Sequence, residues 1–250
     1  MTLALIAAMH EELAAVLERM PDERRERVAG RDFWVGHLGG REVVAVLSGI
    51  GKVAAATTAT LAIQRFGAQA LLFTGVAGGL GEGVRVGDLV VATELLQHDM
   101  DASPIFPRHE LPLYGLSRLR TDAAMSQRLL QAARSVAAEA ARVLGADTLA
   151  AFGIGTPAVH SGLILSGDRF VSTSAESAAL RRELPDALAV EMEGAAVAQV
   201  CHDHGLPLAV LRTISDRADD QAHVDFTAFV QDVARRYSVA LVERYLAAGG

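Results

Sequence analysis

The sequence predicts an α/β fold in three layers, with a mixed, mostly parallel central sheet flanked by helices. Short apolar runs typical of buried strands alternate along the chain with longer runs typical of helices. This alternation favours a largely parallel sheet that helices cover on both faces. The chain has 250 residues, enough for one large domain, and no break in composition divides residues 1–250 into two.

The first half of the chain supplies five expected strands and two expected helices. Gly39-Gly40 is the turn of a hairpin, and the alanine-rich helix opens directly after Gly51. The strands are expected at residues 2–9, 33–38, 42–47, 68–76 and 88–97, and the helices at 11–20 and 52–66.

The second half begins with residues 98–116, which contain Pro104, Pro107 and Pro112 without sustained periodicity and are expected to form a long loop. Strands and helices then alternate again. The strands are expected at residues 148–154, 159–165, 187–190 and 206–214, and the helices at 121–144, 174–184, 192–204 and 226–246.

Composition excludes several classes of function. The net charge of −7 argues against a nucleic-acid surface, which needs concentrated Lys and Arg. The paired arginines at 24–25, 181–182 and 235–236 are expected on solvated helix faces. No uncharged apolar stretch reaches the length of a membrane span, and the run TLALIAAM is read as a strand because acids follow it at once. Cys201 is the single cysteine, which fits a small buried side chain and a reducing cytoplasm.

Acidic residues follow several of the expected strands. Glu12 follows the first, Glu191 and Glu193 the strand at 187–190, and Asp216 the last. Carboxyl ends of parallel strands share one edge, so these acids are expected to meet in one pocket and to carry the chemistry. Helix capping remains an alternative for the two glutamates, and an N-cap for Asp216. Arg212 is expected to pair with a buried carboxylate.

Two glycine-rich segments follow strands. Residues 74–88 lead into a strand instead of a helix, which argues against a dinucleotide loop and leaves tight turns or a backbone wall against a flat ligand. Residues 48–56 precede a helix, but they hold no arginine for a phosphate, and Lys52 is expected to be solvated. The acids and histidine at 98–101 have no second cluster to complete a metal site, so no metal is expected.

Taken together, seven motifs resemble the 5′-methylthioadenosine/S-adenosylhomocysteine nucleosidases of the purine nucleoside phosphorylase superfamily over nearly the whole chain. The resemblance implies a mixed sheet bordering on a distorted barrel, a homodimer, adenine nucleosides as ligands and no cofactor. It implies that water replaces adenine at the anomeric carbon through an oxocarbenium-like transition state. The motifs are AAMHEE (7–12), SGIGKVAAA (48–56), TGVAGGL (74–80), VGD (86–88), SGDRF (166–170), VEMEGAA (190–196) and RTISDRAD (212–219).

The resemblance implies roles for the acids. Asp216, with Ser215 beside it, would protonate the leaving adenine, and Glu12 would orient and deprotonate the attacking water. Glu193 would hold the ribose hydroxyls, with Met192 beneath the sugar. Acid and base must then hold opposite protonation states, so their environments must separate their pKa values.

The resemblance also implies which residues shape the pocket. Phe170 would stack on adenine while the backbone of Val171 holds its edge, and Phe226 would lie near the base and the 5′ tail. Gly78 would line the floor, and Met9 would lie near the water.

The 5′ substituent would be covered by Ile50 and, from the other subunit, by Ile105 and Phe106. Val76 departs from the family, where many members have a small hydroxyl residue that helps to bind the water. Hydrolysis is favoured over phosphorolysis because residues 48–56 and 74–83 contain no arginine for a phosphate, Arg85 lying just beyond them, and because Glu12 would repel phosphate. A futalosine-type hydrolase and a non-catalytic nucleoside-binding protein remain as alternatives.

Overall fold

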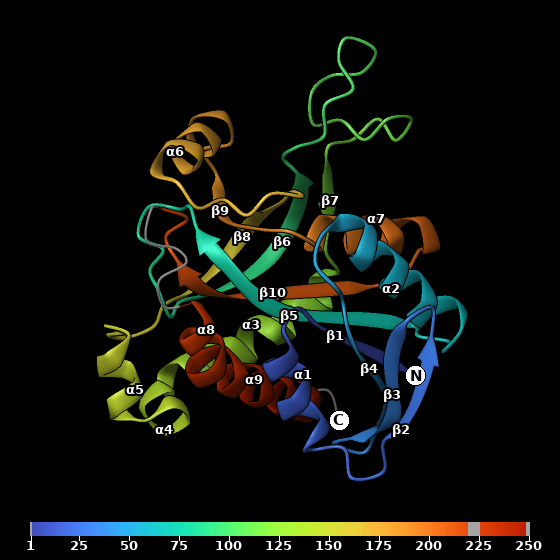
Figure 1. Cartoon of the computed structure of the whole chain (residues 1–250), viewed down its shortest axis with the longest axis vertical. Helices are drawn as coiled ribbons and strands as arrows, with labels where there is room; N and C mark the ends of the chain where they lie inside the picture. The colour runs from blue at the N-terminus through green and yellow to red at the C-terminus, as the bar shows by residue number, and fades with distance from the viewer. Residues whose placement is uncertain (1, 220–225, 249–250) are drawn as a thin grey trace.

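The computed structural model describes residues 2–219 and 226–248 and shows one mixed sheet with helices on both of its faces (Figure 1). The predicted α/β fold with a mixed central sheet between helices is confirmed; parallel and antiparallel pairings are equally frequent, since five of the ten strand pairings in the described residues are parallel. The strands are β1 Leu3–Ala7, β2 Arg24–Val28, β3 Arg31–Leu38, β4 Arg41–Leu47, β5 Ala70–Gly79, β6 Leu89–Gln97, β7 Arg118–Arg120, β8 Val159–Ser166, β9 Ala187–Glu191 and β10 Leu208–Asp216.

Part of the sheet closes on itself. Strand β5 pairs with β10, β10 with β6, β6 with β8, β8 with β9, and β9 returns to the end of β5. Strands β1, β4, β3 and β2 extend the sheet outward from the other part of β5. The closed part corresponds to the distorted barrel that the family resemblance implies.

Helices form the two outer layers. Helices α1, α3 and α9 cover one face of the sheet, and α2 and α7 cover the other (Figure 1). The helical segments are α1 His10–Leu17, α2 Lys52–Gln64, α3 Ala123–Ala138, α4 Ala140–Leu144, α5 Ala146–Ala151, α6 Ser174–Glu183, α7 Gly194–His204, α8 Phe226–Phe229, the π-helix η1 Val230–Ala234 and α9 Arg235–Ala247.

Strand β1 shows why its sequence reads as a continuous apolar run. Leu3 and Leu5 point into the core beneath α1 and α9, whereas Ala4 and Ile6 point into the core beneath α2 and α7. Because successive strand residues face opposite sides, a strand covered on both faces needs apolar residues at every position.

The structure corrects the prediction at four places. Residues 148–154 do not form a strand: α5 begins after Gly145, since a short alanine-rich run suits a helix equally well. The helix expected at 121–144 is divided at Glu139 into α3 and α4. The arginines at 24–25 lie on β2, an edge strand, and not on a helix. Strand β7 falls between the expected elements.

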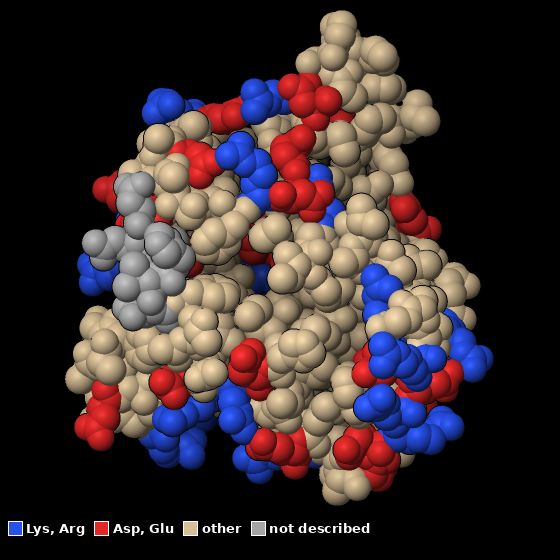
Figure 2. Space-filling view, viewed as in Figure 1, with Lys and Arg blue, Asp and Glu red and all other residues tan. Residues whose placement is uncertain are grey.

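Charge is distributed without segregation on the face shown in Figure 2. Lys and Arg side chains alternate with Asp and Glu around its margin, and uncharged residues occupy most of its centre. Among the described residues, each helix is too short or too polar to cross a membrane. Within the same part of the chain, no group of three or more His, Cys, Asp or Glu is arranged to hold a metal ion.

Candidate active site

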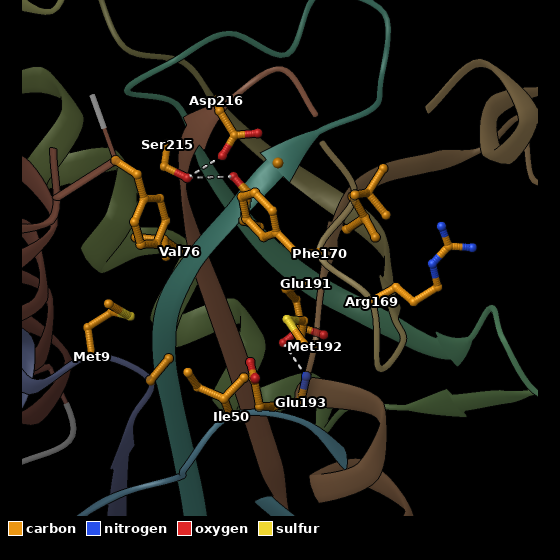
Figure 3. A pocket seen from close by; sticks show the side chains of 16 residues that line it. Met9, Ile50, Val76, Arg169, Phe170, Glu191, Met192, Glu193, Ser215 and Asp216 are labelled. Carbon is orange, nitrogen blue, oxygen red and sulfur yellow. Dashed lines mark hydrogen bonds between the residues drawn. The ribbon is translucent and has the colours of Figure 1, made fainter. Parts of the chain in front are cut away.

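A cavity of about 360 Å³ opens at the carboxyl ends of β1, β4, β5, β8, β9 and β10 (Figure 3). Its lining draws residues from seven separate parts of the chain, and most of the predicted site residues are among them. These are Met9, Ile50, Gly78, Phe170, Val171, Met192, Glu193, Ser215, Asp216 and Phe226.

The opening arises where β5 changes partners. Strand β5 pairs with β1 at residues 70–74 and with β9 at Gly78 and Gly79. The two partners therefore separate along the intervening residues, and Val76 and Ala77 from this stretch line the cavity. The site thus follows from a split in the sheet and not from a single loop.

Asp216 reaches the cavity through a bulge in β10. Ile214 pairs with Ala77 and Asp216 with Gly78, so Ser215 is the extra residue. Gly78 must lack a side chain, since a Cβ there would lie 2.9 Å from Asp216 Oδ1. Gly78 also pairs with Val190 on its other side, which brings the end of β9 close to the end of β10.

The Asp216 carboxylate accepts two short hydrogen bonds. Ser215 Oγ donates to Oδ2 at 2.7 Å, and the Ala218 amide donates to Oδ1 at 2.7 Å. Burial raises the pKa of Asp216 in spite of these two donors, and the Asp219 charge raises it further. This acid therefore retains its proton at a higher pH than an exposed aspartate does.

Glu191 and Glu193, two residues apart, have different surroundings. Glu191 caps α7, because its carboxylate accepts hydrogen bonds from the amides of Glu193 at 3.1 Å and Gly194 at 2.8 Å. It also accepts hydrogen bonds from Ser166 Oγ and from Arg212 Nη2, the latter at 2.6 Å. The capping alternative is thus correct for Glu191, whose hydrogen-bonding capacity is used within the fold.

Glu193, by contrast, is the N-cap residue of α7 but makes no side-chain cap hydrogen bond. Its Oε1 accepts a hydrogen bond from the Gly51 amide at 2.9 Å, and the side chain faces the cavity beside Ile50 (Figure 3). Burial raises the pKa of Glu193, and the neighbouring Glu191 charge raises it further. Its carboxylate is therefore available to a ligand.

Arg212 is fully buried and balances the charge of Glu191. Its guanidinium contacts Glu191 through two nitrogens, at 2.6 and 3.2 Å, and lies 4.1 Å from the centre of the Phe73 ring. The expected pairing of Arg212 with a buried carboxylate is confirmed. The same positive charge lowers the pKa of Glu12 and Glu193, which places all three carboxylates within its field.

Glu12 does not itself line the cavity, although it is bonded to the wall. It is fully buried; the Met9 amide donates to its Oε2 at 3.2 Å, and Ser238 Oγ donates to its Oε1 at 2.5 Å. Burial raises the pKa of Glu12 to about 7. The carboxylate can therefore exchange a proton near neutral pH.

An aromatic pair closes another side of the cavity. Phe170 and Phe226 meet edge to face, with ring centres 6.2 Å apart, and Phe170 remains 48% exposed. The neighbouring Arg169 also lines the cavity, but its guanidinium bonds Glu176 and points away from the other labelled side chains in Figure 3. The aromatic pair forms an apolar wall of the cavity, against which a flat ring can pack.

Ile105 and Phe106 lie outside this cavity, on the loop that projects from the body of the molecule (Figure 1). Ile105 is 81% exposed, like Ile50 and Val53 at the beginning of α2 and Leu113 on the same loop. The structure therefore places Ile105 and Phe106 away from the site of their own chain.

Lys52 is not the solvated side chain that the sequence predicted. Its Nζ donates to Asp99 Oδ1 at 2.6 Å, and its amide donates to Asp168 Oδ1 at 2.7 Å. The Asp168 amide in turn donates to Asp99 Oδ2 at 2.8 Å. These bonds join the turn before α2, the base of the 98–116 loop and the segment that carries Phe170.

Sequence reasoning missed three contributors. Ser166 bonds Glu191, Ser238 bonds Glu12, and Arg169 lines the cavity. Ser166 and Arg169 belong to the SGDRF motif, which gave a signal, whereas Ser238 lies in an ordinary helical run with none. Cys201 is 2% exposed, which confirms the buried interpretation of this cysteine, and burial raises the pKa of its thiol to about 12.

Comparison with known proteins gives concordant results. A sequence profile of the phosphorylase superfamily matches residues 2–247. The chain is 36% identical to a 5′-methylthioadenosine/S-adenosylhomocysteine nucleosidase of Anoxybacillus flavithermus, over 94% of this chain and 93% of the relative. It is also similar to the Neisseria meningitidis nucleosidase in complex with methylthio-immucillin-A, with a TM-score of 0.86 and 34% identity over 100% of this chain and 99% of the other. The chain is similar to the futalosine hydrolase of Helicobacter pylori as well, with a TM-score of 0.83 and 33% identity over 97% of this chain and 96% of the other.

Proposed function

The chain belongs to the 5′-methylthioadenosine/S-adenosylhomocysteine nucleosidase family of the phosphorylase superfamily, and we infer that it hydrolyses the N-glycosidic bond of these two nucleosides and of 5′-deoxyadenosine. The products are adenine and a 5′-substituted ribose. One observation carries this inference: Asp216 and Glu193 face a single apolar cavity from opposite sides, and Glu12 is bonded to the Met9 backbone in its wall.

Asp216 acts as the general acid. Departure of adenine as an anion is unfavourable, and protonation of its imidazole-ring nitrogen makes it a neutral leaving group. The raised pKa of Asp216 supports this role, because the proton must be present when the nucleoside binds. Ser215 and the Ala218 amide hold the carboxyl group in one orientation.

Glu193 holds the ribose. One carboxylate can accept hydrogen bonds from two neighbouring hydroxyl groups, and Met192 presents an apolar surface to the sugar. As the glycosidic bond breaks, positive charge develops on the ribose. Carboxylates already fixed beside that charge stabilise the transition state without reorganisation.

Glu12 receives the proton of the attacking water. The raised pKa of Glu12 makes it a stronger base than an exposed glutamate, while a fraction remains ionised near neutral pH. Val76 offers no hydroxyl group in the cavity, so the water is positioned by Glu12 and by backbone groups near Met9.

The remaining residues bind the two ends of the substrate. Adenine packs against the aromatic pair of Phe170 and Phe226, with its edge on the Val171 backbone and Gly78 in the floor. The 5′ substituent lies against Ile50.

We also propose a homodimer, in which the exposed apolar residues of α2 and the 98–116 loop meet a second copy. Ile105 and Phe106 of the second copy then complete the 5′ end of the site.

Residues 1–250 are proposed to form a single nucleoside-hydrolase domain, of which residues 1, 220–225 and 249–250 lie outside the described part. A reducing cytoplasm suits the single buried thiol.

Hydrolysis is preferred to phosphorolysis because phosphate would lack a cationic partner. Among the described residues that line the cavity, Arg169 is the only cation, and it is bonded to Glu176. Arg212 is engaged by Glu191. Because the chain is similar to a futalosine hydrolase, futalosine-type nucleosides are the alternative substrate class. The same carboxylates would serve a nucleoside with a larger 5′ arm.

An assay that measures the released purine base tests the proposal. The purified chain is incubated with 5′-methylthioadenosine, S-adenosylhomocysteine, 5′-deoxyadenosine or futalosine, with and without phosphate. We expect each of the first three substrates to release adenine, and the rate for each one to be the same with and without phosphate. Turnover that requires phosphate would refute hydrolysis, and turnover of futalosine alone would transfer the assignment to that substrate. Tight nucleoside binding without any turnover would indicate a binding protein.

A further inference from the structure

The C-terminal helical segment reaches the site at two positions. Phe226, at the beginning of α8, lines the cavity, and Ser238, on α9, bonds Glu12. The π-helix η1 lies between them, and such insertions often occur at functional sites. The segment therefore links the aromatic side of the cavity to the buried carboxylate.

The Ser238 hydroxyl is fully buried in the packing between α9 and α1. Its neighbours on α9 include Tyr237 and Leu241, which are fully buried core residues. A hydroxyl group in such surroundings is unfavourable unless it is bonded, and its bond here is the 2.5 Å contact with Glu12 Oε1. Packing alone would be served equally well by alanine.

The carboxylate of Glu12 is held from two directions. The Met9 amide, at the N-cap of α1, donates to Oε2 at 3.2 Å, and the Ser238 hydroxyl donates to Oε1 at 2.5 Å from α9. Two donors on different oxygens fix both the position of the carboxylate and the rotation of its plane. Without Ser238, only the longer of these two bonds from the described residues would remain, and the plane could rotate about it.

We propose that Ser238 is a positioning residue that holds Glu12 in the orientation needed to receive the proton of the attacking water. This inference rests on the proposed function, in which Glu12 is the base. Ser238 does not touch the cavity, so it acts through Glu12 alone. Loss of the hydroxyl is expected to slow the chemical step and to leave substrate binding intact.

Ser238 also affects the charge of Glu12. A donor to a carboxylate favours the ionised form, so this bond lowers the pKa of Glu12 against the raising effect of burial. The charged groups that face Glu12 are Arg212 on β10, which lowers the pKa, and Glu11 on α1, which raises it. Removal of Ser238 alone leaves both of these in place.

The test compares Ser238→Ala with the wild-type chain. We expect kcat for 5′-methylthioadenosine to fall by about 10-fold or more and KM to change by less than about 2-fold, and the rising limb of kcat to move to higher pH by about one unit. Ser238→Thr retains the hydroxyl group and should recover most of kcat. Ser126→Ala is the matched control, because Ser126 is a buried serine on α3 that bonds Thr121.

An unchanged kcat and pH profile in Ser238→Ala, or a higher KM with unchanged kcat, would overturn the inference. If Ser238→Ala is too unstable to assay, the Glu12 carboxyl band of Ser238→Thr is followed by infrared titration instead. The band is identified by its loss in Glu12→Gln. A band at the wild-type frequency supports the inference, and a displaced band with full kcat refutes it. Failure of the proposed function would appear separately, as wild-type activity in Glu12→Gln.

Discussion

The buried carboxylates fall into two regions that differ in how completely the fold satisfies them. At the foot of α7, Glu191 accepts hydrogen bonds from Ser166, from backbone amides and from the guanidinium of Arg212. Asp216 in the cavity and Glu12 behind its wall, by contrast, each accept two hydrogen bonds and have no cation in direct contact among the described residues. All of these groups are buried to a similar extent.

The difference shows that burial alone does not identify a functional acid. Desolvation raises the pKa of a carboxylate, and donors together with a paired cation offset that effect. Glu191 has backbone donors, a hydroxyl donor and a paired guanidinium and serves as structure, whereas burial raises the pKa of Glu12 and Asp216. The number and charge of the donors therefore separate the structural acid Glu191 from the two acids that we propose to be catalytic.

The largest effect is expected from Asp216→Asn, which tests the cavity side of the comparison. Asparagine retains the shape but has no acidic proton, so adenine release from 5′-methylthioadenosine should fall by about 10²–10⁴-fold. Nucleoside binding, measured by calorimetry, and thermal unfolding should remain close to wild type. Asp147→Asn, at an exposed position on α5, is the control and should retain full activity. Wild-type adenine release in Asp216→Asn would refute the assignment of the acid.

The next largest effect is expected from Arg212→Met, which tests the region at the foot of α7, where Glu191 is fully hydrogen-bonded. Loss of the guanidinium leaves Glu191 charged, buried and without its cation, so the free energy of unfolding should fall by about 3–5 kcal/mol in urea titrations. Arg235→Met is a matched control, since Arg235 and Glu18 also form a 2.6 Å ion pair but on the surface. That change should cost about 0–1 kcal/mol. Equal losses in the two variants would contradict the distinction between the regions.

The smallest effect concerns pH and Glu12. Because the pKa of Glu12 is raised from 4.5 to about 7, the folded chain retains a proton that the unfolded chain has lost between these values. The free energy of unfolding should therefore fall as pH rises through this window, with a contribution from Glu12 of up to about 3 kcal/mol.

Glu12→Gln cannot titrate, so its free energy of unfolding should vary less with pH than that of the wild type. Urea titrations at about pH 5 and about pH 7.5 measure the difference. Glu18→Gln, at an exposed position, should keep the wild-type dependence. An identical dependence in Glu12→Gln and wild type would show that the pKa of Glu12 is not raised.

The sequence was most informative where the spacing of apolar residues matches the faces of the element that are buried. Strand β1 reads as a strand because both of its faces are covered, and the acids after β1, β9 and β10 stand out because charge is unusual at the end of an apolar run. Prediction failed where the local sequence suits a helix and a strand about equally well. The alanine-rich run of α5 suits either type of element, and β2 carries the charges of an edge strand.

By itself, the sequence determined which segments are buried on both faces, where acids follow strands and which family the motifs resemble. Only the tertiary structure decided which acid is satisfied and which is free, because that depends on donors far away in the chain. Glu191 meets Arg212, and Glu12 meets Ser238 across 226 residues. Hydrogen bonds of this kind are set by how the strands and helices pack, and residue spacing along the chain carries no record of them.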